Sequence, residues 1–407
     1  MNISFILPQG MRPGGVKTWS VEMSQKLVKL GNSVFLVEHC DRERTPKITL
    51  DSKVNWLRCI GQYPFFLSDE ETISDYLLTY EKVLPSTIIP NWSVGTYATC
   101  AAIARKNPEA IRVIGFAHSD ENAFYDLLTY YEPMISCFVA VSKEIEVKLQ
   151  QRIPHRKKDI SLHPYAVNVE VDFSRSYSSE DKPLRLVYAG RLEEQQKRVS
   201  DLIKLAQILD KKKVNFELQI VGDGPSLEGL TKQVQSFQSS LQNRIHFAGK
   251  LPYHRIPGIF KASDICVMVS AFEGTSIAML EAMASGCVPV VTQVSGTSAV
   301  IQTGENGYLA ELGNLEQMAQ IIQQLDADRD QLKRLGDNAH RLIAQNYSYQ
   351  EYIDWFLKMV ANSWESPSLP WPQYRSLIPS WQTDNRGEFK KIFKKTIQPI
   401  FKMFSSR

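Results

Sequence analysis

The chain has 407 residues, of which 43% are hydrophobic and 22% are charged. This length suits two or three domains, and the ordinary composition excludes a collagen-like, a disordered or a disulfide-scaffold protein. The 47 basic and 44 acidic residues leave a net charge of only +3, which excludes a chain whose whole body binds nucleic acid.

The cysteines and the apolar runs indicate where the protein works. None of the six cysteines forms a C-x-x-C pair, so neither a zinc site nor a dithiol redox centre is predicted. No run approaches the roughly 20 apolar residues of a membrane-spanning helix, and the N-terminus lacks the basic segment of a signal peptide. We therefore expect a reduced, cytoplasmic protein.

The first half of the chain alternates short apolar runs with helical patterns. Residues 2–7 predict a strand, a turn follows at Gly14 and Gly15, apolar residues recur every three or four positions over 16–30, and residues 33–37 predict the next strand. This βαβ unit implies parallel strands with a right-handed crossover. Further strands are predicted at residues 86–89, 113–117 and 137–141.

A second series of strands and helices follows a polar, serine-rich segment. Its strands are predicted at residues 184–189, 216–221, 245–247, 264–269 and 288–291. Repeated βα alternation predicts an α/β fold with doubly wound parallel sheets, in which ligands bind at the carboxyl ends of the strands. We therefore predict two Rossmann-like domains that face a cleft.

The boundaries of these parts follow from the same patterns. We predict an N-terminal domain over residues 1–173, a linker over 174–183, a C-terminal domain over 184–346, a helix over 347–365 that crosses back to the N-terminal domain, and a basic amphipathic tail over 366–407.

The strongest candidate site begins at Glu273, in a turn that follows a strand ending near Ser270. A helix is predicted to start at about Thr275, with Thr275 or Ser276 as its cap. A helix start offers free backbone N–H groups and a positive dipole end, which suit an anion. Glu273 and Glu281 would repel a phosphate, so we expect them to accept hydrogen bonds from sugar hydroxyls. Glu281 lies in an apolar segment, where a charge needs a partner; the alternative is a carboxylate on the helix surface.

The second candidate site follows the first strand of the second series. Arg191 and Lys197 place two cations on one loop, and an Arg fork with a Lys point charge suits a diphosphate. The alternative is a solvated, charged loop. An Asp-x-Asp pair at Asp326 and Asp328 lies in a polar helical stretch, so we predict no metal site there.

Two features of the N-terminal half face the same cleft. Gly14 and Gly15 let backbone amides approach a phosphate closely, although a tight turn alone would also explain them. His118 follows the strand at 113–117 and so lies at a strand end; the alternative is a histidine whose hydrogen bonds serve only the fold.

These motifs, in this order, resemble the retaining glycosyltransferases of family 4. The Glu273–Glu281 pair with the following Ala-Met-Ala-Ser-Gly is the most specific match, and the segment from Tyr188 to Lys197, the Val-Gly-Asp-Gly-Pro turn at 221–225, the Val-Ser-Lys at 141–143 and the early glycine pair support it. The resemblance covers about residues 1–363. It implies the GT-B fold and transfer of a sugar from a nucleotide-diphosphate donor, with retained configuration and without a metal or another cofactor.

The resemblance also implies roles for single residues. Arg191 and Lys197 would bind the diphosphate, Glu281 the ribose hydroxyls, and Glu273 the donor sugar. The remaining implied contacts are the backbone of Gly274, Thr275 and Ser276 near the phosphate and sugar, Gly15 with Gly14 at the phosphate, His118 beside the anomeric centre, and the backbone around Gly249 at the base. Two departures stand out. The spacing from Arg191 to Lys197 is one residue longer than usual, and the usual Asn-Gly-Val-Asp turn appears here as Val-Asn-Val-Glu-Val-Asp at residues 167–172, so this turn cannot rely on glycine.

The chemistry fits these residue types. Departure of a diphosphate leaves negative charge that fixed cations and a helix start stabilise. The acceptor hydroxyl is expected to belong to a cell-surface polysaccharide or glycolipid. Two alternatives stay open, a GT-B sugar-nucleotide epimerase or phosphorylase and a non-catalytic, membrane-tethered sugar-nucleotide binder.

The tail differs from the rest of the chain in charge. Residues 366–407 hold eight Lys or Arg and two Asp or Glu, a net charge of +6 by count. Apolar residues between 387 and 404 recur at helical spacing, and five lysines fall mostly on the opposite face. This pattern is typical of a helix that lies on an anionic membrane surface; Pro399 would kink it, and docking on the protein itself is the alternative.

Overall fold

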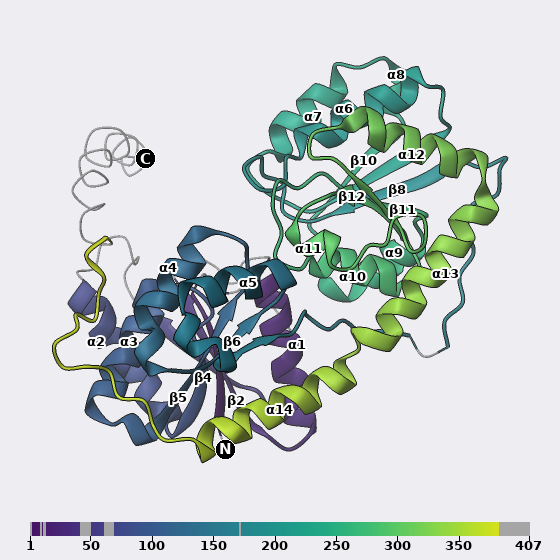
Figure 1. The fold of residues 1–407 in the computed structure, drawn as a ribbon. Coiled ribbons are helices and arrows are strands. Elements are labelled where there is room, and N and C mark those ends of the chain that lie inside the picture. Colours follow the sequence, from purple (N-terminus) through teal and green to yellow (C-terminus); the bar gives the residue numbers. More distant parts are fainter. Residues whose placement is uncertain are drawn as a thin grey trace, which may run out of the picture.

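The computed structural model describes residues 2–8, 10, 14–40, 50–60, 69–170 and 172–381. They form two α/β domains joined by a linker and by two long helices (Figure 1). The predicted amphipathic tail beyond residue 381, and the residues between 60 and 69, lie outside the described residues.

The N-terminal domain is built on a parallel sheet in the order β3-β2-β1-β4-β5-β6-β7. Its strands are β1 (Asn2–Leu7), β2 (Ser33–Cys40), β3 (Asn55–Ile60), β4 (Ser86–Ile89), β5 (Ile111–Ala117), β6 (Ile135–Ala140) and β7 (Ile160–Leu162). Its helices are α1 (Gly15–Lys29), α2 (Asp69–Tyr80), α3 (Val94–Lys106), α4 (Asn122–Tyr131) and α5 (Lys143–Arg152).

The C-terminal domain repeats this plan in the order β10-β9-β8-β11-β12-β13. Its strands are β8 (Leu184–Ala189), β9 (Phe216–Val221), β10 (Ile245–Gly249), β11 (Ile265–Met268), β12 (Val288–Thr292) and β13 (Tyr308–Ala310). Its helices are α6 (Ser200–Lys211), α7 (Leu227–Gln235), α8 (Ser239–Gln242), α9 (Ile256–Lys261), α10 (Ile277–Ala284), α11 (Ser295–Ser298), α12 (Leu315–Ala327) and α13 (Arg329–Asn346).

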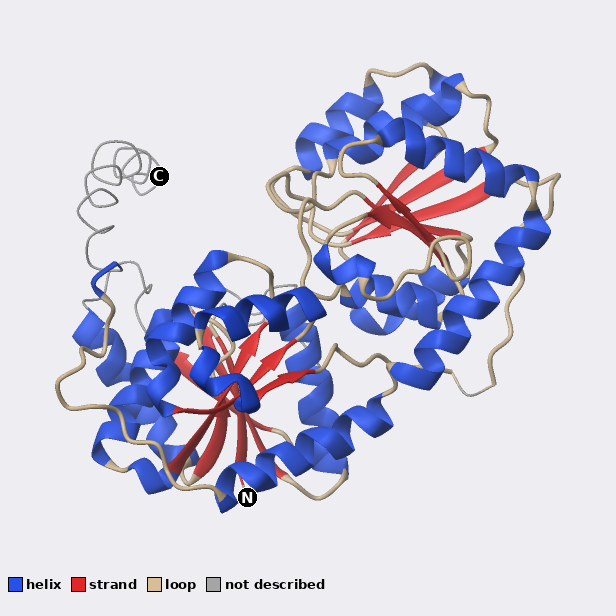
Figure 2. Cartoon of the chain, viewed as in Figure 1, coloured by secondary structure: helices blue, strands red, loops and turns tan. Residues whose placement is uncertain are grey.

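Both sheets confirm the predicted fold class of two doubly wound, Rossmann-like domains. Helices cover both faces of each sheet (Figure 2). The central strands are therefore buried, as all seven residues of β5 are. Three described strands were not predicted, namely β3, β7 and β13. Each lies at the edge of its sheet, where one flank is unpaired and polar residues such as Arg58 are tolerated, so the apolar signal is weak.

The last long helix, α14 (Tyr349–Glu365), packs against the N-terminal domain. Phe356 stacks on Phe5 of β1 with ring centroids 5.9 Å apart, and Trp364 Nε1 donates a hydrogen bond to Thr87 Oγ1 at 2.7 Å. Since α13 belongs to the C-terminal domain, α13 and α14 together form a second connection between the domains (Figure 1).

The segment before β8 packs on the C-terminal domain. Ser178 Oγ donates to Asp264 Oδ2 at 2.7 Å, and the Arg185 guanidinium donates to both carboxylate oxygens of Asp264. Burial opposes the ionisation of Asp264, but these hydrogen bonds outweigh it and lower the pKa of this carboxyl. The ionised Asp264 carboxylate therefore holds the linker and the start of β8 in place on the C-terminal domain.

Candidate functional site

The strand orders locate one crevice in each domain. In each sheet the order reverses beside the first strand, between β1 and β4 and between β8 and β11. Ligands of doubly wound sheets bind outside the carboxyl ends of the strands at such a reversal. Several of the predicted site residues lie at these two points: Gly14 and Gly15 follow β1, the loop with Lys197 follows β8, and Glu273 follows β11. His118 instead follows β5, and Gly249 ends the edge strand β10.

Lys197 and Glu273 meet at the crevice of the C-terminal domain. Lys197 Nζ lies 2.6 Å from Glu273 Oε1, and their side chains are 18% and 6% exposed. Arg191 does not join this pair: its side chain is half-exposed and its Nη2 lies 3.4 Å from Glu193 Oε1. The structure therefore places one predicted cation on the floor of the site and the other at its rim.

Glycines allow the loop after β9 to pack closely on the loop after β8. A Cβ on Gly222 would lie 1.8 Å from the carbonyl oxygen of Gly190, and one on Gly224 would lie 2.3 Å from that of Leu192. The turn after β9 thus packs directly on the backbone of the cationic loop. Gly249 has a positive φ of +64°, and its carbonyl oxygen accepts a hydrogen bond from the N–H of Gly222 at 2.9 Å.

Helix α10 begins two residues later than predicted, at Ile277. Ser276 is its N-cap, and its Oγ accepts a hydrogen bond from the N–H of Met279 at 3.4 Å. Thr275 does not cap the helix, because its Oγ1 donates instead to the carbonyl oxygen of Val141 in the other domain. The helix start therefore keeps free N–H groups at the crevice, and a neighbouring side chain ties it to the N-terminal domain.

The backbone of Gly274 is enclosed from two sides. An added Cβ there would lie 2.1 Å from the carbonyl oxygen of His118. On the other side, a Cβ on Gly296 of α11 would lie 1.7 Å from the carbonyl oxygen of Gly274. The two domains touch at this point, and only glycine fits. Across the same boundary a Cβ on Gly15 would lie 3.5 Å from Ile277 Cδ1, whereas one on Gly14 would meet nothing within 4 Å.

His118 is buried, and protein groups occupy both of its ring nitrogens. Nε2 lies 3.0 Å from Asn91 Oδ1, and Nδ1 contacts the hydroxyl of Tyr165. Since the Asn91 amide nitrogen donates to the carbonyl oxygen of Ile6, its oxygen is an acceptor, so Nε2 carries the proton and Nδ1 accepts from Tyr165. Burial lowers the pKa of His118 to about 3, and the imidazole is therefore neutral.

Glu281 has a partner that the sequence did not indicate. Tyr253, in the short helix η5 (Tyr253–Arg255), donates its hydroxyl to Glu281 Oε1 at 2.6 Å. No hydrogen bond from another described residue reaches Oε2. Burial raises the pKa of Glu281 to about 7, against the opposing effects of the Tyr253 hydrogen bond and of Lys17.

Lys17 contributes a further charge from the opposite domain. It lies in the first turn of α1, and burial together with the nearby charge of Lys250 lowers its pKa. Neither Tyr253 nor Lys17 carries a sequence signal, because each becomes important only when the two domains meet.

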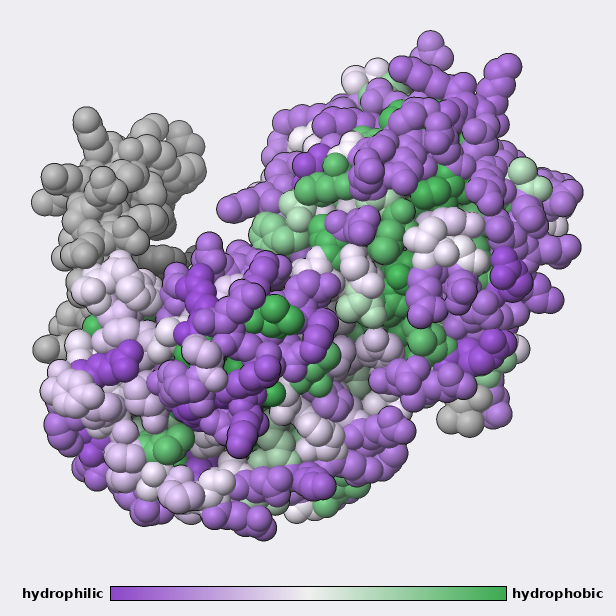
Figure 3. All heavy atoms as spheres, in the orientation of Figure 1, coloured by the Kyte–Doolittle hydropathy of each residue, from purple (hydrophilic) through white to green (hydrophobic). Residues whose placement is uncertain are grey.

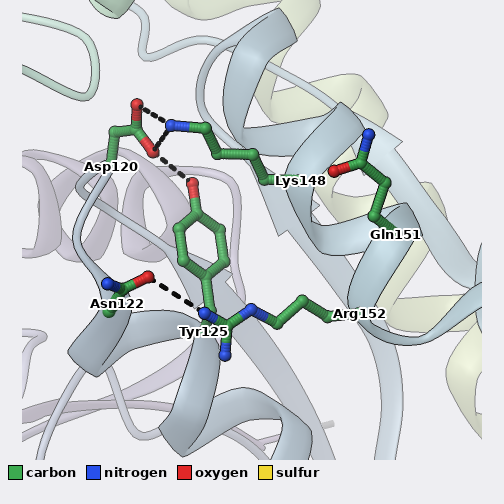
Figure 4. A pocket seen from close by; sticks show the side chains of 6 residues that line it. All are labelled: Asp120, Asn122, Tyr125, Lys148, Gln151 and Arg152. Atoms are coloured by element: carbon green, nitrogen blue, oxygen red, sulfur yellow. Dashed lines mark hydrogen bonds and ion pairs between the residues drawn. The ribbon is translucent and has the colours of Figure 1, made fainter.

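A pocket of about 350 Å³ opens beside this boundary (Figure 4). It is lined by Asp120, Asn122, Tyr125, Lys148, Gln151 and Arg152. Asp120 accepts hydrogen bonds from Tyr125 Oη at 2.6 Å and from Lys148 Nζ at 2.7 Å. The pocket is polar, and Asp120 in its lining lies two residues after His118 in the chain. In the view of Figure 3, apolar side chains gather along the C-terminal domain near the same junction.

The described residues offer neither a cluster of metal ligands nor a membrane-spanning helix. Among them, no group of three or more His, Cys, Asp or Glu side chains gathers closely enough to hold a metal ion. Likewise, none of the helices in the described ranges is long and apolar enough to cross a bilayer.

Solved structures share this architecture. TarM of S. aureus, solved with Fondaparinux, alpha-GlcNAc-glycerol and UDP, matches with a TM-score of 0.72 at 13% identity over 90% of this chain and 100% of that one. Sucrose-phosphate synthase of Thermosynechococcus elongatus matches with a TM-score of 0.72 at 16% identity over 90% and 100%. These likenesses establish the GT-B fold of two Rossmann-like domains.

The sequence comparisons relate the C-terminal domain to a known family. Residues 171–342 match the family described as Glycosyl transferases group 1. N-acetyl-alpha-D-glucosaminyl L-malate synthase of Bacillus anthracis is 29% identical over 39% of this chain and 40% of its own length. The GPI3 subunit of phosphatidylinositol N-acetylglucosaminyltransferase of Saccharomyces cerevisiae is 26% identical over 74% and 69%. Residues 171–342 of this chain are therefore similar to the group 1 glycosyltransferases. The match covers only 40–44% of the length of three curated relatives, one of which is the malate synthase.

Proposed function

We propose that the protein transfers a sugar from a nucleotide-diphosphate sugar to a hydroxyl acceptor, with retained configuration and without a metal ion. The contact between Lys197 and Glu273 beside the start of α10 carries this proposal. It combines a cation, a hydrogen-bond acceptor and free backbone N–H groups at the reversal point of the sheet, where a nucleotide is expected.

The donor would lie along the carboxyl ends of the C-terminal strands. Its diphosphate would contact Lys197, Arg191 at the rim and the free N–H groups at Ser276, while its sugar hydroxyls would bond to Glu273. Its ribose would donate to Glu281 Oε2, and its base would lie against the backbone at Gly249. HepE of Anabaena, which matches this chain with a TM-score of 0.67 at 15% identity, was solved with UDP, and this supports UDP as the first nucleotide to try.

The reaction would proceed on one face of the sugar. The bond between the anomeric carbon and the phosphate oxygen breaks, the acceptor oxygen bonds to the same face, and the acceptor proton passes to the leaving phosphate. Lys197 and the helix start stabilise the charge that develops on the leaving group. Buried, neutral His118 has no free ring nitrogen for that proton, so we assign it to shaping the site.

The acceptor would enter from the N-terminal domain. The polar pocket at Asp120 and Lys148 offers both donors and acceptors to a carbohydrate. The basic sequence of the tail, and the phosphatidylinositol in the name of the yeast relative, favour a glycolipid or lipid-linked polysaccharide acceptor at the inner face of an anionic membrane. The protein would then be cytoplasmic and peripheral to that membrane.

A donor screen tests this proposal. The protein is incubated with UDP-, GDP- and ADP-sugars, with and without EDTA, and the released nucleoside diphosphate is measured. We expect release from one donor class, unchanged by EDTA, and an NMR coupling constant in the product that shows the donor's configuration. Loss of turnover in EDTA would overturn metal independence, and an inverted product would overturn retention.

A further inference from the structure

A carboxylate lies inside the loop that carries the two predicted cations. Glu193 Oε2 accepts a hydrogen bond from the backbone N–H of Gln195 at 3.0 Å. Its Oε1 accepts from the N–H groups of Gln196 at 3.1 Å and of Lys197 at 3.2 Å, and Arg191 Nη2 lies 3.4 Å from the same oxygen. A single side chain therefore gathers three successive backbone donors and contacts one of the cations.

These contacts leave Glu193 little capacity to bind a ligand. An ionised carboxylate offers about four lone pairs, and three N–H groups together with one guanidinium engage both of its oxygens. The side chain is also only 12% exposed. Glu193 therefore acts on the backbone of its own loop and not on a substrate.

The loop is anchored on either side of this turn. Before the turn, the N–H of Leu192 donates to the carbonyl oxygen of Asp223 at 2.9 Å, in the turn after β9. After it, the carbonyl oxygen of Gln196 accepts from the N–H of Ala271 at 2.7 Å, and Gln196 Nε2 donates to the carbonyl oxygen of Phe272 at 3.2 Å. Between these anchors, the carboxylate supplies the acceptors for the N–H groups of the turn.

The position of Lys197 follows from this turn. Lys197 comes directly after Gln196, which fixes the loop to the backbone just before Glu273. Its Nζ lies 2.6 Å from Glu273 Oε1, and its own N–H is one of the three donors that Glu193 holds. Without the carboxylate, both Lys197 and the half-exposed Arg191 would lose a contact that sets their place.

We propose that Glu193 is a positioning residue of the transfer reaction, because its carboxylate folds the loop that presents Lys197 and Arg191 to the donor diphosphate. Glu193 acts through these two cations, since its own oxygens are already engaged. A negative charge beside a diphosphate would by itself repel the ligand, so repulsion and positioning predict opposite effects when the charge is removed. The inference rests on the proposed transferase function, and the experiment separates the failure of one from the failure of the other.

The test compares variants of the full chain by two measurements. Isothermal titration calorimetry gives the affinity for UDP, or for the nucleoside diphosphate that the donor screen selects, and steady-state turnover of the matching sugar nucleotide gives kcat/KM. Glu193→Gln keeps the size of the side chain but turns one acceptor into a donor that faces a backbone N–H. We expect the affinity to fall about fivefold and kcat/KM to fall about 10–100-fold, because misplacing a catalytic group by about 1 Å costs up to about 10²-fold.

Two further variants serve as rescue and control. Glu193→Asp keeps the charge, and since an aspartate readily accepts the N–H two residues on, kcat/KM should stay within about threefold of the original. Glu194→Gln removes the same charge from the next residue, an exposed glutamate whose carboxylate bonds to Ser200 at the start of α6. Salt screens such a charge, so both measured values should stay within about twofold of the original.

A double variant shows whether Glu193 acts through Lys197. In a Lys197→Met background the cation is already lost, so adding Glu193→Gln should lower the affinity and kcat/KM by less than about threefold more. A merely structural weakening of the domain would lower both by the same factor in either background. If Glu193→Gln does not fold, Glu193→Asn takes its place, since its amide oxygen can still accept one N–H, and kcat/KM should then fall at least about fivefold.

Several results would overturn the inference while the original chain stays active and the proposed function stands. Tighter nucleotide binding by Glu193→Gln would show that the carboxylate only repels the diphosphate. Unchanged kinetics in a folded Glu193→Gln variant, a Glu193→Asp variant that loses as much, or equal factors of loss with and without Lys197 would each show that the turn does not place the cation. If the original chain released no nucleoside diphosphate from any sugar nucleotide, the proposed function would fail, and the inference with it.

Discussion

The hydrogen bond from Tyr253 to Glu281 predicts how nucleotide binding depends on pH. Ribose hydroxyls donate, so they need the ionised carboxylate, and affinity should rise as the pH passes the Glu281 pKa of about 7. Tyr253→Phe removes a donor that lies 2.6 Å from Oε1. A hydrogen bond to a charged group stabilises that charge by about 1.5–3 kcal/mol, which corresponds to about one to two pKa units. In the variant, a water molecule would make up part of this loss by donating to the carboxylate in place of the tyrosine.

We therefore expect Tyr253→Phe to raise the pH midpoint of nucleotide affinity by roughly one unit and to weaken binding at neutral pH about fivefold. The assay is isothermal titration calorimetry with UDP, or with whichever nucleoside diphosphate gives the largest thermal shift, between about pH 6 and pH 9. Tyr374→Phe changes a tyrosine that is 92% exposed and should leave the midpoint in place.

Two results would refute this reasoning. An unchanged midpoint in Tyr253→Phe would show that the tyrosine does not affect the ionisation of Glu281. Tighter binding by the variant at every pH would show that Tyr253 competes with the ribose for the carboxylate instead of positioning it.

Three further changes test other parts of the site and the fold. Lys197→Met should lower kcat/KM by about 10²–10³-fold, as expected when a charge that stabilises the leaving group is lost; Lys232→Met, on exposed α7, should leave steady-state kinetics unchanged. Gly274→Ala would place a Cβ 2.1 Å from the carbonyl oxygen of His118, so the two domains should separate. Turnover should then fall at least about tenfold while nucleotide binding persists. An unchanged radius of gyration, measured by X-ray scattering, would contradict this prediction. Asp264→Asn should lower the free energy of unfolding in urea by about 3 kcal/mol because it unbalances a buried ion pair. Since the pKa of Asp264 is lowered, this stabilisation should be present at neutral pH and vanish as the pH falls through the acidic range. Equal losses of stability at neutral and at acidic pH would argue against this reasoning.

Much of the fold could be predicted because buried parallel strands leave a strong pattern. The runs that became β1, β5 and β8 are apolar on both faces, and the helix α1 begins and ends within a residue of its predicted bounds. The three missed strands are sheet edges, where polar residues replace apolar ones and the pattern fades.

The site could be predicted only in part. The strand-end position of Glu273 and Lys197 follows from the βα pattern, but their 2.6 Å contact joins residues 76 positions apart in the chain. Tyr253 escaped prediction for the same reason, since its partner lies in another element. Of the two predicted caps of α10, Ser276 is confirmed. Thr275 does not cap the helix because its hydroxyl donates to an acceptor in the other domain, which no local pattern reveals.

A crystal structure of the protein with a nucleoside diphosphate, grown in EDTA, tests the central claim most directly. The diphosphate should lie within hydrogen-bonding distance of Lys197 Nζ and of the backbone N–H groups at the start of α10, with the ribose on Glu281. A nucleotide bound elsewhere, or one that enters the crystal only when a divalent cation is added, would contradict the account.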